Sequence, residues 1–162
     1  MQTRRIFLAA VALTLVAPAL AADSPRDIVV RIYKLSAGPK GDYAGASAFF
    51  KDAFRKSTFS KALLKDMLAM DAQAKKDDAV PGLDFDPVTN SQDPSVKKLS
   101  IAAESEDGGK AVVAAKFFSF EETKPTVVRY FFITENGAWK LDDMSSGEGD
   151  DGWKLRALLK LR

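Results

Sequence analysis

The stretch TVVRYFFITENGAWKLDDM, residues 126–144, decides the fold, because it holds two strand-forming runs joined by a tight turn. β-Branched and aromatic residues dominate the run from Thr126 to Thr134, and such residues favour strands. Asn136 and Gly137 form the dipeptide that a two-residue hairpin turn prefers. The chain then returns over residues 139–144. This stretch therefore predicts an antiparallel hairpin.

A second hairpin is predicted just before the first one. Leu99, Ile101 and Ala103 alternate with polar or small residues, as in a strand with one buried face. The sequence DGG at residues 107–109 forms a turn, and an apolar run returns over residues 111–120. Together the two hairpins predict an antiparallel sheet of about four strands.

Helical patterns precede the sheet. Ser24 and Pro25 suit the N-cap and the first turn of a helix that is expected to end near Gly38. A second helical patch covers residues 47–54, and a third carries apolar residues at helical spacing over residues 63–74. A short helix is also expected over residues 153–161. This order of elements predicts an α+β domain in which N-terminal helices pack on a curved antiparallel sheet.

Large apolar side chains are predicted on both faces of the sheet. Phe117 and Phe118 are neighbours on one strand, as are Phe131 and Phe132 on the next, and successive strand residues point to opposite faces. Both faces should therefore be covered. The helices cover one face, and either the C-terminal helix or the sheet of a second copy covers the other. A homodimer is thus one expected arrangement.

The N-terminal segment has the pattern of an export signal. Arg4 and Arg5 precede an apolar run, and Ala19 and Ala21 form the small-x-small pattern of a cleavage site. The pattern predicts a signal peptide over residues 1–21, read by the Sec or the twin-arginine route, and a single domain over residues 22–162. We therefore expect a periplasmic or secreted protein that has no membrane anchor after cleavage.

Composition argues against several kinds of function. Of the 24 Lys and Arg residues, two lie in the predicted signal, so the mature chain has 22 of them against 22 acidic residues and is neutral. A nucleic-acid-binding domain needs a surplus of basic residues, so we expect no nucleic-acid partner. The chain has no His and no Cys, which are the usual zinc ligands and the usual members of catalytic dyads. We expect no cofactor.

Two short motifs resemble a known bacterial family. They are DFDP at residues 84–87, followed by QD at residues 92–93, and AWKLDDM at residues 138–144. The chain resembles the domain-of-unknown-function family 3828, and its order of elements is similar to that of the nuclear-transport-factor-2-like cone. The resemblance implies an exported domain in which the sheet curls around a helix and leaves a pocket at the wide end. It implies no activity.

The candidate site combines these motifs with residues of the expected pocket. If the loop over residues 80–94 covers the mouth of the cone, its acids meet those at the end of the last long strand, where crowded carboxylates raise one another's pKa or attract a cation. Alternatively, the loop acids accept backbone N–H bonds and hold a proline-rich loop in shape. The ligand-binding candidates are Tyr33, Asp84, Asp86, Gln92, Asp93, Trp139, Asp142 and Asp143.

Two functions remain open on this reading. The first is an exported module that binds a small ligand or a protein partner and performs no catalysis. The alternative is a small acid-base enzyme of the isomerase or dehydratase kind, with an Asp as base and Tyr33, Tyr43 or Tyr130 as proton donor in the pocket. Lys116 and Arg129 interrupt apolar strands, so they either bind an anion in the pocket or lie at an exposed edge.

Overall fold

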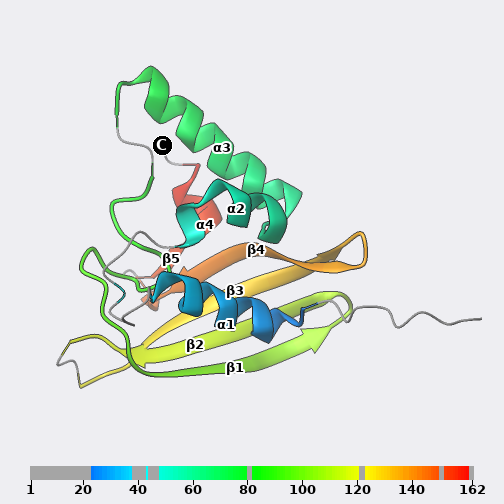
Figure 1. Ribbon diagram of the computed structural model, residues 1–162, viewed down its shortest axis with the longest axis vertical. Helices are drawn as coiled ribbons and strands as arrows, with labels where there is room; N and C mark the ends of the chain where they lie inside the picture. The colour runs from blue at the N-terminus through cyan, green and yellow to red at the C-terminus, as the bar shows by residue number, and fades with distance from the viewer. Residues whose placement is uncertain are drawn as a thin grey trace, which may run out of the picture.

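The computed structural model describes residues 23–37, 43, 48–79, 82–120, 123–149 and 152–160. The elements are α1 (Pro25–Ser36), the 3-10 helix η1 (Ala48–Phe50), α2 (Asp52–Thr58), α3 (Lys61–Lys76), β1 (Lys97–Asp107), β2 (Lys110–Phe118), β3 (Thr126–Glu135), β4 (Ala138–Ser146), β5 (Trp153–Lys154) and α4 (Leu155–Leu158). The five strands form one antiparallel sheet in the order β1-β2-β3-β4-β5. Helix α1 crosses this sheet, and α2, α3 and α4 lie beside β4 (Figure 1).

The α+β class and the antiparallel sheet are therefore confirmed, with five strands where about four were expected. The predicted signal segment lies outside the described residues. Among those that are described, no helix has the length and apolar character needed to cross a membrane.

Both predicted hairpin turns form, and their backbone explains their sequences. Gly108 and Gly109 have φ of +54° and +75°, and Asn136 and Gly137 have φ of +52° and +75°. A two-residue turn with positive φ at both positions matches the right-handed twist of the flanking strands, and glycine and asparagine tolerate that conformation best. Each turn thus sets the register of one strand pair.

The helices begin where their caps allow. The Ser24 side chain accepts a hydrogen bond from the Asp27 N–H at the start of α1, and Pro25 occupies the first turn, as predicted. Ser60 caps α3 in the same way through the Leu63 N–H. The expected apolar stripe of α3 is also confirmed, because Leu63, Met67 and Met70 are buried.

The C-terminal segment differs from the expected helix over residues 153–161. Trp153 and Lys154 pair with Ser146 and Ser145 as a fifth strand, and the helix begins only at Leu155. The Trp153 indole N–H donates to Asn90 Oδ1 at 2.6 Å, and its ring packs against Phe85. These contacts to a loop distant in sequence hold the segment extended, and no local pattern could reveal them.

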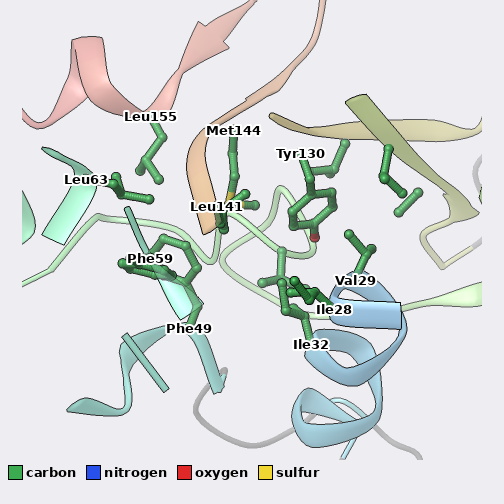
Figure 2. Packing of buried hydrophobic residues seen from close by; sticks show 14 of the residues in the cluster. Ile28, Val29, Ile32, Phe49, Phe59, Leu63, Tyr130, Leu141, Met144 and Leu155 are labelled. Atoms are coloured by element: carbon green, nitrogen blue, oxygen red, sulfur yellow. The ribbon is translucent and has the colours of Figure 1, made fainter. Parts of the chain in front are cut away.

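One core joins the sheet to all of the helices. Leu155 lies beside Leu63 and Met144, while Ile28, Val29 and Ile32 of α1 lie toward Tyr130 (Figure 2). Leu155 of α4 is fully buried in this same core. The expectation that the C-terminal helix covers the second face of the sheet is therefore wrong. It packs on the same side as the other helices, because its apolar residues complete the core beside β4.

Candidate functional site

The acidic loop is held by its own side chains. Asp86 Oδ1 accepts from the Val88 N–H at 2.9 Å, and Asp86 Oδ2 accepts from the Thr89 hydroxyl at 3.2 Å. The backbone of Asp86 also pairs with that of Ser91, which closes the turn. Such bonds from an aspartate to residues two and three positions ahead are typical of turns. Asp86 therefore has the structural role that was one of its two predicted alternatives.

This turn inserts Val88 into the core below α1. Val88 is fully buried, and its carbonyl accepts a hydrogen bond of 2.8 Å from the Tyr33 hydroxyl. The Tyr130 hydroxyl in turn donates to the Tyr33 oxygen at 3.3 Å. Burial raises the pKa of both tyrosines well above 10.0. Both phenols are thus neutral, and the Tyr33 hydroxyl holds the loop through the Val88 carbonyl.

The acids of β4 are bound to α3 and α4. Arg156 donates from Nε to Asp66 at 3.0 Å and from Nη1 to Asp142 at 3.2 Å. Asp142 also accepts from the Ser60 hydroxyl, and Asp143 Oδ1 accepts from the Arg156 and Met144 N–H groups. Arg156 therefore connects three elements, a role that its place near the chain end did not reveal.

The structure brings the predicted site residues together only in pairs: Tyr33 bonds to the turn that Asp86 holds, and Asp142 and Asp143 both bond to Arg156. Asp84, Gln92 and Asp93 are exposed on the loop, Trp139 is half-buried near the β3–β4 hairpin, and Asp142 and Asp143 face α4. Across the described part of the chain, no three acidic residues gather in a way that could hold a metal ion. The contacts thus fit a structural role for these acids better than a shared site.

Two open cavities lie elsewhere, on either side of the β4–β5 loop. One has a volume of about 410 Å³ and is lined in part by Asn90, Lys124 and Arg129. The other has a volume of about 350 Å³ and reaches Trp153 and Lys154. None of the eight predicted site residues lines either cavity.

The face of the sheet that points away from the helices, which we call the outer face, is rich in apolar side chains. Residues on β2 and β3 alternate strictly between fully buried and half-buried positions, so the second set belongs to this face. No described helix covers it. Its apolar residues are Val112, Ala114, Phe118, Val127, Phe131 and Ile133.

Charged residues interrupt this apolar surface. Arg129 donates from Nε to Glu104 of β1 at 2.9 Å, and this bond raises the pKa of Arg129. Lys116 is exposed between Ser100 of β1 and Val127 of β3. Both residues therefore lie on the outer face but on inner strands of the sheet and not at an edge, and Arg129 also lines the cavity of about 410 Å³.

Comparisons with known proteins bear on the fold. No family model and no curated protein matches the chain. A chain in the crystal structure of the type VI native effector-immunity complex Tae3-Tai3 from Ralstonia pickettii is similar to it, with a TM-score of 0.53 and 16% sequence identity. The match covers 77% of this chain and 96% of that chain. At this identity the likeness concerns the fold alone.

Proposed function

We propose that the mature chain is an exported, non-catalytic module that binds a protein partner on the outer face of its sheet. The observation that carries the proposal is the row of half-buried apolar side chains on β2 and β3, which no described element covers. An exposed sheet face rich in apolar side chains, with a few charged residues among them, is typical of protein interaction sites.

The alternative of acid-base catalysis has less support. A general acid must reach its substrate, whereas the Tyr33 hydroxyl is buried and bonded to the Val88 carbonyl. A base must likewise be free to accept a proton, whereas Asp86 and Asp143 accept from backbone N–H groups. A small ligand would have the two open cavities near the β4–β5 loop.

The structural comparison is compatible with a protein partner. The similar chain belongs to a complex between an effector and an immunity protein. We carry over from it only the idea that this fold serves to hold another protein. The export signal, the periplasmic location and membership of the cone superfamily belong to the same proposal. N-terminal sequencing of the exported protein should begin at Ala22.

The test uses Phe131 and a matched control. Leu68 is an apolar residue of α3 that is 50% exposed, and α3 packs on the core side of the sheet through Leu63 and Met67. Mature wild-type, Phe131→Ser and Leu68→Ser proteins are immobilised and exposed to periplasmic extract, and the retained proteins are identified by mass spectrometry. The proposal expects a protein that the wild type and Leu68→Ser retain and that Phe131→Ser loses. Retention that is the same on all three variants refutes it.

A thermal-shift screen addresses the small-ligand alternative. A ligand that binds only the folded state at about 100 times its dissociation constant adds about 2.7 kcal/mol to the stability. The small-ligand alternative would be supported by a ligand that raises the melting temperature of the wild type and of Phe131→Ser but not that of a variant in a cavity residue such as Lys124.

A further inference from the structure

We propose that the partner on the outer face is an acidic protein whose carboxylates meet Lys116 and Lys154; this inference rests on the proposed function and adds the chemistry of the partner. The chain as a whole is neutral once the predicted signal is removed, but its charges are not evenly placed. By the strand register, six basic and four acidic described residues belong to the outer face: Lys97, Lys110, Lys116, Arg129, Lys140 and Lys154, and Glu104, Asp107, Glu135 and Asp143.

The four acids of this face and two of its lysines already have partners. Glu135 and Asp143 accept hydrogen bonds from backbone N–H groups, and Lys97 and Lys140 donate to the carbonyls of Phe120 and Ser57. Glu104 forms an ion pair with Arg129, and Asp107 lies directly opposite Lys110 in the register of β1 and β2. Lys116 and Lys154 remain, and neither forms an ion pair with any described residue. Among the described residues, Lys116 therefore has no opposite charge beside it on this face, whereas Lys154 lines a cavity together with Glu148.

The position of Lys116 among apolar side chains shows why its charge matters for the choice of partner. Its neighbours along β2 are Ala114 and Phe118, and Val127 lies opposite it on β3. Any partner that covers these apolar side chains also removes water from the Lys116 ammonium. Desolvation of a charge is costly unless an opposite charge replaces the water. A partner with carboxylates at these points meets that condition.

A second copy of this chain does not meet it. Two identical outer faces would bring two positive surpluses together, and the acids of each face are already used within it. Like charges placed across an interface act against association. The same charge pattern therefore favours a different, acidic protein over the homodimer.

Two helical peptides with the same leucine stripe serve as probes, one with Glu and the other with Lys on both sides of the stripe. Binding to the isotope-labelled mature protein is followed by nuclear magnetic resonance, and shifted amide signals show where each peptide lies. We expect the Glu peptide to shift outer-face signals and to bind at least about tenfold more tightly than the Lys peptide. Raising the salt concentration should reduce this preference, because salt screens exposed charges.

Three variants separate this inference from the proposed function. Lys116→Glu should reverse the preference and Lys116→Gln should remove it, while Lys56→Glu on α2 should leave it unchanged. If Phe131→Ser abolishes binding of both peptides but Lys116→Glu leaves the preference intact, the face is a docking site and the acidic partner is refuted. If neither peptide shifts outer-face signals, the proposed function fails as well.

Two further measurements can overturn the inference. Light scattering measures the mass of the protein at micromolar concentration. A dimer that Phe131→Ser dissociates would assign the face to a second copy. Binding to anionic phosphatidylglycerol vesicles that Lys116→Glu abolishes would assign it to a lipid surface. The proposal expects a monomer that does not bind the vesicles, and thermal denaturation of each variant confirms that it is folded.

Discussion

Substitution of Tyr33 by Phe should destabilise the protein without affecting binding on the outer face. The Tyr33 hydroxyl donates to the Val88 carbonyl at 2.8 Å and accepts from the Tyr130 hydroxyl at 3.3 Å. Both neighbours are fully buried, so water cannot replace the lost partner. A buried polar group that loses its hydrogen bond costs about 1–3 kcal/mol. We expect a loss of about 2 kcal/mol, most of it from the shorter bond to Val88.

Tyr130→Phe provides the matched comparison. It removes only the longer bond and leaves Tyr33 bonded to Val88, so it should cost about 0.5–1 kcal/mol. In the double variant, Tyr130→Phe also removes the hydroxyl that Tyr33→Phe left unpaired. The two losses should therefore add to less than their sum, as is common for residues in one network.

Urea unfolding of the mature protein, followed by the fluorescence of Trp139 and Trp153, measures all three free energies of unfolding. Equal losses from the two single variants would contradict the view that the bond to Val88 is the important one. A Tyr33→Phe variant that kept its full stability would show that the loop is held in another way. Peptide binding to the outer face should be the same in each variant.

Three further predictions concern other parts of the core. Burial raises the pKa of Tyr33 and Tyr130 above 10.0, so the free energy of unfolding should be unaffected below about pH 10. Above that pH it should fall by about 1.4 kcal/mol per pH unit for each tyrosine, which urea unfolding at alkaline pH can measure. Asp71→Ala removes the carboxylate that pairs with the Arg55 side chain, which is only 6% exposed. Thermal denaturation should show a loss of stability of about 2 kcal/mol, and adding Arg55→Met to this variant should restore part of it. Gly109→Ala places a Cβ 2.6 Å from the Thr134 hydroxyl, on a residue whose φ is +75°. The variant should lose about 1–2 kcal/mol of stability. An unchanged midpoint in urea unfolding would contradict this.

The parts of the fold that depend on local chemistry could be predicted from the sequence. The turn at Asn136 and Gly137 and the cap at Ser24 follow from backbone conformations that only a few residue types favour. The apolar side chains on both faces of β2 and β3 likewise follow from neighbouring residues such as Phe131 and Phe132, because successive strand residues point to opposite faces. For these features a few neighbouring residues suffice.

Features that depend on distant contacts could not be predicted. Trp153 and Lys154 become a strand because Ser145 and Ser146 pair with them, and two residues are too few to show a period. On β4, an irregular register between Phe131 and Phe132 leaves Asp142 unpaired in the strand ladder, where it meets Ser60 and Arg156. The candidate site assumed that acids in two sequence motifs also converge in space, but Asp86 bonds within its own turn, and Asp142 and Asp143 bond to Arg156 of α4.

The two neighbouring phenylalanines of β3 show why the outer face calls for a functional explanation. Phe132 is 1% exposed and belongs to the core, so the stability of the monomer accounts for it. Phe131 is adjacent in sequence but points to the opposite face, where no described element covers it. A polar residue at this position would serve the sheet equally well, because a sheet with one wet face normally alternates apolar with polar residues. Among the described residues, nothing in the fold therefore requires the apolar character of the outer face, and this is the ground on which we propose a partner that covers Phe131.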